Sequence, residues 1–244
     1  MLRNIDQTIN KQPRSGCMDM WNSFMVKDAS FSLTSDIPFC PCTAKALPVE
    51  LISYEDAKAL YRKEIKSGSK DFSDNRYIHF YIDDQKFDGK KDGIWLYPEK
   101  ALEIIKHFGG IITPDFSTNA DFPDPWKRFN TYRMRAFGYW IGTNDISVIN
   151  NVRWGTLETW DYCFDGIPYN SILCIGIVAS GLKSLDNRNL FELGFVELIN
   201  RLNPHTIIFY GSADYQFIKK IIKDRNINII SFPSKTSLAY ERRK

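Results

Sequence analysis

Aspartates that end or adjoin apolar, strand-like segments are the first candidates for chemistry in this sequence. Asp83 and Asp84 end one such segment, Asp115 ends the next, and Asp165 lies in the turn FDGIP that precedes a later one. Four carboxylates on one edge could bind a divalent cation, or divide acid and base roles between them. Asp84, Asp115 and Asp165 are therefore candidate catalytic residues, and Asp83 is a candidate ligand-binding residue. The structural alternative is that each aspartate forms a turn or is solvated.

The segment 125–141 predicts a helix with an arginine inside its apolar face. At the helical period Arg133 falls in the middle of that face, and Arg128 and Arg135 fall opposite. An unpaired arginine there would carry a large desolvation cost, so Arg133 should pair with a carboxylate. The position of the helix makes Asp115 or Asp165 the expected partner. The apolar face consists of Trp126, Phe129, Phe137, Trp140 and Ile141.

Hydroxyl side chains follow several of the strand-like segments. Ser117, Ser180 and Ser212 lie at predicted turns between a strand and a helix. Helix N-termini flanked by hydroxyls bind anions, and Arg133 with Arg153 could form a two-pronged clamp, so the set suits a phosphate-bearing ligand. The alternatives are ordinary helix capping for the serines, and an ion pair that orients the helix, or a side chain that snorkels to the rim, for Arg133.

The sequence gives few indications of a cofactor. Trp154 and Tyr210 could stack a base or ring at the same rim, with core packing as the alternative. There is no Walker-type loop and no Gly-x-Gly-x-x-Gly, which argues against the familiar ATP and dinucleotide sites. The three histidines are scattered and no Gly-x-Ser-x-Gly occurs, which disfavours a histidine metal site and acyl transfer. A divalent metal ion is the cofactor that the carboxylates suggest, and its ligands stay unassigned.

Alternating elements should bring these residues to one edge. The pattern predicts an α/β fold with about six parallel strands joined by right-handed crossovers. Polar residues follow nearly every strand, which favours a (β/α)-barrel-like sheet, incomplete or closed by the N-terminal arm; an open doubly wound sheet is the alternative. The expected strands are 77–84, 110–115, 146–153, 172–179, 206–210 and 227–232, and the helices between them include 125–141, 156–163, 186–202 and 214–223.

Length and composition indicate one large domain. We interpret residues 1–52 as an irregular N-terminal arm with a Pro-rich loop, 53–236 as a single α/β domain, and 237–244 as a charged tail. Ser53 and Asp56 have the spacing of a capping box at the start of a helix that runs to about Lys66. The formal charge of the 244 residues is only +3, which gives little support to direct binding of duplex DNA.

The five cysteines and the hydropathy bear on the compartment. An odd number of cysteines without a secretory leader indicates a reducing cytoplasm. Cys40 and Cys42 form a Cys-x-Cys with no second cluster to complete a tetrahedral metal site, so a Pro-rich loop is the simpler interpretation. No apolar segment approaches the roughly twenty residues of a membrane span, and no membrane partner is expected.

Several phrases of the sequence together resemble a known family. They are IDD at 82–84, GGIITPDFS, NVRWG, CFDGIP with the strand SILCIGIVASG, and LNPHTIIFYGS. In this combination, over about Ile82 to Ser212, the chain is similar to a family of uncharacterised proteins from bacteriophages, plasmids and other mobile elements of Gram-positive bacteria. The resemblance implies a phage or mobile-element origin and a role in the bacterial host cytoplasm. It implies no activity.

Two classes of function follow. In the first, the chain binds a phosphate-bearing ligand, a nucleotide or a nucleic acid, at the carboxyl edge of the sheet, and one carboxylate serves as base or metal ligand in a hydrolase. In the second, the chain is a non-catalytic interaction protein for a host or phage factor, and the rim residues pair with one another and leave no cavity. A pocket at the edge would favour the first class.

Overall fold

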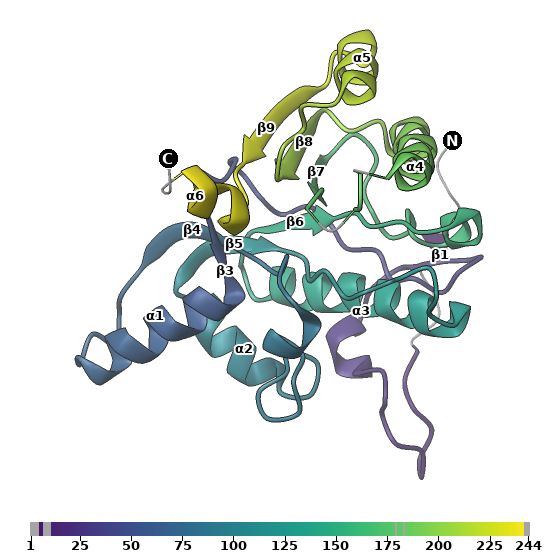
Figure 1. The fold of residues 1–244 in the computed structure, drawn as a ribbon. Helices are drawn as coiled ribbons and strands as arrows, with labels where there is room; N and C mark the ends of the chain where they lie inside the picture. The colour runs from purple at the N-terminus through teal and green to yellow at the C-terminus, as the bar shows by residue number, and fades with distance from the viewer. Residues whose placement is uncertain (1–4, 7–10, 179, 183, 242–244) are drawn as a thin grey trace.

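A seven-stranded parallel sheet forms the centre of the molecule (Figure 1). The computed structural model describes residues 5–6, 11–178, 180–182 and 184–241. Each strand pairs in parallel with its neighbours in the chain, in the order β3-β4-β5-β6-β7-β8-β9. The strands are β3 Leu51–Ser53, β4 Asp74–His79, β5 Phe108–Ile112, β6 Val148–Asn151, β7 Ile172–Gly176, β8 Thr206–Tyr210 and β9 Asn228–Phe232. A separate antiparallel pair joins β1 Ile5–Asp6 to β2 Phe31–Ser32.

The sequential strand order explains the shape of the sheet. Each crossover moves one strand in the same direction, so the helices gather on one face and the sheet curls into an open half-barrel (Figure 1). A doubly wound sheet would reverse its order at a switch point, and this sheet has no reversal. The expected α/β fold of parallel strands in an incomplete, barrel-like arrangement is confirmed.

The helices begin and end where local chemistry favours it. Ser53 caps the first helix, where its Oγ accepts a hydrogen bond from Asp56 N at 3.2 Å, as the capping-box spacing predicts. Asn203 and Asn226 end two later helices with positive φ values of 42° and 51°. The α-helices are α1 Tyr54–Lys66, α2 Pro98–Ile105, α3 Asp124–Thr143, α4 Leu185–Leu202, α5 Gln216–Arg225 and α6 Lys235–Glu241; the short 3-10 helices are η1 Ser23–Val26, η2 Asp84–Lys86 and η3 Leu157–Asp161.

One strand of the sheet was missed by the sequence analysis. β3 pairs with β4 through Leu51↔Tyr77 and Ile52↔Ile78, in a stretch assigned to a loop. Three residues are too few to show an alternating pattern, and only the pairing with β4 defines the strand. The sheet thus has seven strands instead of six.

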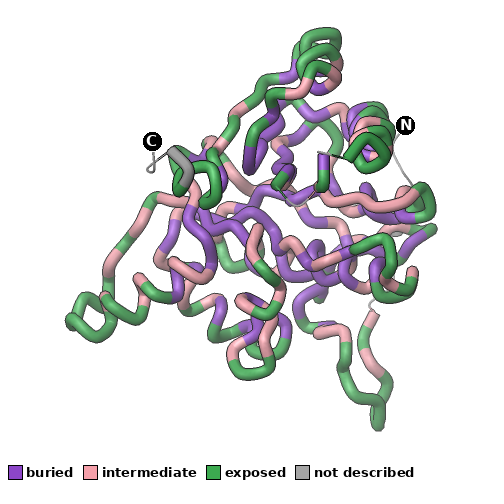
Figure 2. Tube along the Cα trace, viewed as in Figure 1, coloured by how far each residue is buried: buried purple, intermediate pink, exposed green. Residues whose placement is uncertain are grey.

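The central strands of the sheet are buried (Figure 2), and hydrophobic clusters lie on both of its faces. Two large clusters fill the helical face, and they include Ile111, Val148, Leu173 and Ile207 from the strands. The inner face of the curl carries a smaller cluster of Tyr77, Ile112, Ile149, Cys174 and Ile208. Cys42, Ala44 and Leu47 from the Pro-rich part of the arm pack against this inner cluster, as does Leu51 of β3. The arm therefore covers apolar surface that an incomplete barrel would otherwise expose.

Arg135 of α3 is fully buried and holds three chain segments together. Its guanidinium donates to the backbone carbonyls of Asn151 at 3.0 Å, Cys163 at 3.2 Å and Asp165 at 3.2 Å. The pattern of α3 correctly placed Arg135 opposite Arg133, but both faces of this helix are buried. Burial lowers the pKa of Arg135 to about 10, which leaves the side chain charged at neutral pH.

We predict that Arg135→Met destabilises the protein by about 3 kcal/mol or more, because three buried carbonyls would lose a charged donor. Urea unfolding monitored by circular dichroism measures the change. Arg128→Met on the same helix is the matched control, since Arg128 only stacks on the ring of Tyr162 at 4.5 Å; its expected cost is below about 1 kcal/mol. Equal effects of the two changes would contradict this role of Arg135.

Candidate functional site

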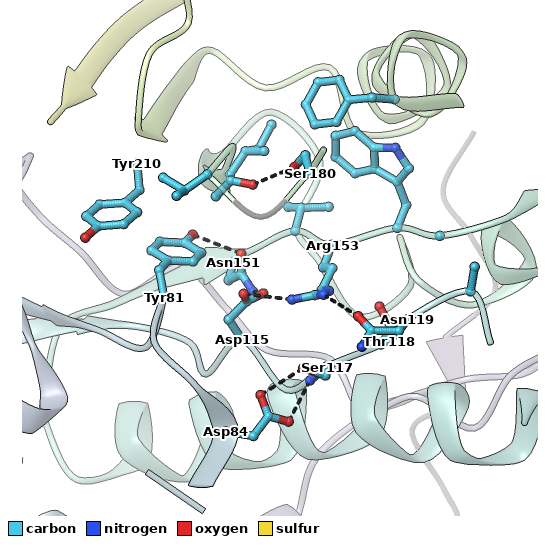
Figure 3. Close-up of a pocket in the computed structure, with 18 of the residues that line it drawn as sticks. Tyr81, Asp84, Asp115, Ser117, Thr118, Asn119, Asn151, Arg153, Ser180 and Tyr210 are labelled. Atoms are coloured by element: carbon cyan, nitrogen blue, oxygen red, sulfur yellow. Dashed lines mark hydrogen bonds and ion pairs between the residues drawn. The ribbon is translucent and has the colours of Figure 1, made fainter. Parts of the chain in front are cut away.

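A cavity of about 910 Å³ opens at the carboxyl edge of the sheet (Figure 3). Its lining comes from the segments that follow β4, β5, β6 and β7, from the start of α4 and from the end of β8. The curl of the sheet places these strand ends around a common centre. Of the residues selected from the sequence, the cavity gathers Asp83, Asp84, Asp115, Ser117, Arg153, Trp154, Ser180 and Tyr210.

A chain of hydrogen bonds crosses the cavity (Figure 3). Asp115 accepts from Arg153 Nη1 at 2.9 Å and from Asn151 Nδ2 at 2.9 Å. Asn151 Oδ1 in turn accepts from the hydroxyl of Tyr81 at 2.9 Å, and Arg153 Nη2 donates to Asn119 Oδ1 at 3.2 Å. The network joins residues that follow β4 and β5 to the end of β6 and the segment beyond it. Asp115 and Arg153 are therefore oriented before any ligand binds.

A second carboxylate is fixed on the same side of the cavity. Asp84 accepts from Ser117 N at 3.0 Å and from Ser117 Oγ at 2.9 Å, one bond to each carboxylate oxygen. Asp83, one residue earlier, is exposed to solvent. Hydrogen bonds thus hold Asp84 in one orientation, whereas Asp83 points to solvent.

Stacked aromatic rings form the wall beside β8. Tyr81 lies against Tyr210 with ring centroids 5.0 Å apart and an interplanar angle of 15°, and His79 lies 4.4 Å from Tyr210. Gly176 makes this possible, because a Cβ at that position would come within 2.6 Å of the Tyr81 ring. Tyr210 is only 6% exposed and both neighbours occupy its surroundings, so the proposal that it stacks a ligand base loses support. Burial also raises the pKa of Tyr81 well above its ordinary value.

The opposite wall is apolar and combines Trp154, which follows β6, with Phe191 of α4. Trp154 packs on Phe191 with centroids 4.7 Å apart. A Cβ at Gly194 would come within 2.2 Å of the indole, so glycine there lets Trp154 lie against the helix. Ser180 does not aim its hydroxyl at open space, since Oγ donates to the carbonyl of Gly176 at 3.1 Å. The cavity thus has a polar side near Asp84 and an apolar side near Trp154.

Three of the selected residues lie outside the cavity lining. Asp165 is buried away from the cavity, where it accepts from Ser32 Oγ at 2.8 Å and Ser35 Oγ at 2.7 Å. The N-terminal arm supplies both serines, which the local turn pattern around Asp165 could not indicate. Ser212 is exposed, and its hydroxyl accepts from Asp214 N at 3.2 Å, as a turn-forming serine does.

Arg133 also points away from the cavity. The prediction that it pairs with Asp115 or Asp165 was wrong: its partner is Asp88, and its guanidinium lies 3.9 Å from the centre of the Phe116 ring. Asp88 follows η2 and lies 45 residues earlier in the chain, so no periodicity linked the two. Burial raises the pKa of Asp88 despite the nearby Arg133. The two-pronged arginine clamp is therefore reduced to Arg153.

The cavity also contains functional groups that the sequence analysis missed. Tyr81, Asn119 and Asn151 take part in the hydrogen-bond network, and Thr118 lines the cavity next to Asn119 in the chain. Asn151 had a recognisable signal, because two asparagines interrupt the apolar strand VINN. A polar pair in a buried strand indicates partners inside the fold. Tyr81 and Asn119 carried no such signal.

Among the described residues, no group of three or more His, Cys, Asp or Glu side chains could hold a metal ion. Burial raises the pKa of the Cys40 thiol to about 12. No helix within the described ranges is long and apolar enough to cross a bilayer.

Comparisons with known proteins identify relatives of the chain. A family model described as a domain of unknown function (DUF4417) matches residues 29–233. The Gene 1 protein of Mycobacterium phage L5 is 36% identical over 134 residues, which are 55% of this chain and 56% of that protein. The Gene 1 protein of Mycobacterium phage D29 is 33% identical over 138 residues, 57% of this chain and 49% of that protein. The match thus spans about half the length of each of these curated relatives, and no solved structure matches the chain.

The histidine behind the tyrosine stack predicts a pH dependence of stability. Burial lowers the pKa of His79 to about 3, and its Nδ1 accepts from Tyr81 N at 3.2 Å, which requires a neutral ring. Because the unfolded chain binds a proton near pH 6.5 and the folded chain does not, stability should fall as the pH drops below that value. Between pH 7 and pH 5 the unmodified protein should lose about 2 kcal/mol more than His79→Gln. Urea unfolding at the two pH values measures this; parallel losses would contradict it.

Proposed function

We propose that this chain, which belongs to the DUF4417 family of unknown function, binds a phosphate-bearing molecule in the cavity at the carboxyl edge of the sheet. Relatives of the chain occur in mycobacteriophages. The proposal rests on the fixed orientation of the Arg153 guanidinium at the cavity wall. Asp115 and Asn119 orient its two terminal nitrogens, and the same guanidinium lines a cavity of about 910 Å³. A fixed arginine fork matches phosphate oxygens in geometry and charge.

The size and walls of the cavity favour a ligand with a ring. A volume near 910 Å³ lies in the range of small-molecule sites. Trp154 and Phe191 offer apolar surface on one side, and polar groups that could meet hydroxyls or phosphates lie on the other. A nucleotide, or a nucleotide unit of a nucleic acid, combines both kinds of group. The start of α4 adds a favourable field, because Asn187 of its first turn lines the cavity and helix N-termini attract anions.

Hydrolysis of the bound ligand is the activity that the carboxylates would add. Asp84 and Asp115 both line the cavity in fixed orientations, and either could orient or deprotonate a water molecule. Release of inorganic phosphate from a nucleotide, abolished by Asp115→Asn, would support a hydrolase. Binding without turnover would favour the alternative, a non-catalytic interaction protein for a host or phage factor.

A reducing compartment fits the cysteines. All five are free thiols, and three of them, Cys40, Cys163 and Cys174, are buried in the core. We therefore place the protein in the cytoplasm of the bacterial host, where thiols persist. This compartment is also where nucleotides are available.

We predict that Arg153→Ala weakens nucleotide binding by about 10-fold to 100-fold, the range expected when a charged hydrogen bond to phosphate is lost. Arg153→Lys should recover only part of the affinity, since it keeps the charge but loses the fork. Isothermal titration calorimetry against a panel of nucleotides measures both. Arg225→Ala is the matched control, because Arg225 is an exposed arginine that contacts Asn200 away from the cavity. Unchanged affinity in Arg153→Ala would overturn the proposal.

A further inference from the structure

The charges that line the cavity do not balance. Asp83, Asp84 and Asp115 are acidic, and Arg153 is the one basic side chain among the described lining residues. Asp115 and Arg153 form an ion pair with Nη1 and Oδ2 2.9 Å apart, so they largely offset each other. The two remaining carboxylates would repel a phosphate-bearing ligand that enters alone. A cation that accompanies the ligand would remove this repulsion.

We infer, resting on the function proposed above, that the ligand is a nucleoside diphosphate or triphosphate that binds as its complex with a divalent cation. Asp84 faces the cation, and Arg153 holds phosphate oxygens. Two adjacent phosphates chelate Mg²⁺ far better than one does, and Mg²⁺ in proteins commonly takes one or two carboxylates together with substrate phosphates. The inference therefore selects polyphosphates from the wider class of phosphate-bearing molecules.

The orientation of Asp84 suits a metal ligand. Among the described residues, each of its oxygens accepts one hydrogen bond, from Ser117 N or Ser117 Oγ, which leaves lone pairs on both oxygens for a cation or its water shell. Backbone and hydroxyl donors hold the carboxylate without neutralising its charge. Asp115, in contrast, is already paired with a guanidinium, so Asp84 is the better choice.

One short loop links the two proposed positions. Ser117 donates to Asp84, and Asn119, two residues later, accepts from Arg153. The carboxylate proposed to face the cation and the guanidinium proposed to hold phosphate are therefore held by the same loop. Thr118, between these two residues, also lines the cavity, but its Oγ1 is buried.

The way in which cation and nucleotide should bind follows from the lack of a preformed metal centre among the described residues. No cluster of three metal-binding side chains occurs among the described residues, so protein groups alone would hold Mg²⁺ weakly. Cation and nucleotide should therefore bind cooperatively, each supplying part of the other's site. Mg²⁺ alone should produce no measurable stabilisation.

Calorimetry can measure the coupling between Mg²⁺ binding and nucleotide binding. Calorimetric titration of the full chain with ADP should give an affinity about tenfold or more higher with Mg²⁺ than with EDTA. Asp84→Asn should lose the Mg²⁺ effect and bind ADP in EDTA better than the unmodified protein, because the repulsion is reduced. Asp121→Asn, an exposed aspartate of the same loop outside the cavity lining, should behave as the unmodified protein. Equal ADP affinity in Mg²⁺ and EDTA would overturn the inference and leave the proposed function intact, whereas no ADP binding in either would overturn both.

Discussion

Parallel pairing of strands in sequential order is the constraint on which the rest of the structure depends. Because every crossover moves one strand in the same direction, the sheet curls with α1 to α5 outside. The curl turns a row of strand ends into a ring, so that Tyr81, Asp115 and Arg153, from three different connections, lie within reach of one another. A flat sheet with the same strands would spread these side chains along a line. The cavity is therefore a product of topology before it is a product of side chains.

Much of the fold and part of the site could be predicted from residue patterns. Five of the six predicted strands overlap closely with observed ones because buried parallel strands are short, apolar and bounded by polar residues. The change from apolar to polar residues at the end of each strand also located Asp115, Arg153 and Ser180 on the rim. Such a position can be predicted from the local sequence alone. The first predicted strand, 77–84, was displaced: β4 spans Asp74–His79, and η2 begins at Asp84.

Contacts made by the N-terminal arm and the loops could not be predicted from such patterns. Arg133 needed a carboxylate on physical grounds, but its partner Asp88 comes from a loop whose path only the folded chain defines. Asp165 was assigned to the same edge although its turn precedes β7 instead of following a strand, and it lies beneath Ser32 and Ser35 of the arm. For Arg133 the need for a partner was judged correctly, but the partner was not. Burial of a charge predicts that a partner exists and does not identify it.

The walls of the cavity depend on two missing side chains. Gly176 and Gly194 are the positions where a Cβ would come within 2.6 Å of Tyr81 and 2.2 Å of Trp154. Glycine therefore lets two aromatic rings lie directly on a strand and on a helix, where their motion is restricted by backbone instead of by flexible side chains. Tyr81 held in this way presents its hydroxyl to Asn151, and Asn151 in turn orients Asp115. The orientation of the Asp115 carboxylate thus depends, through Asn151 and Tyr81, on the lack of a side chain at Gly176 of β7.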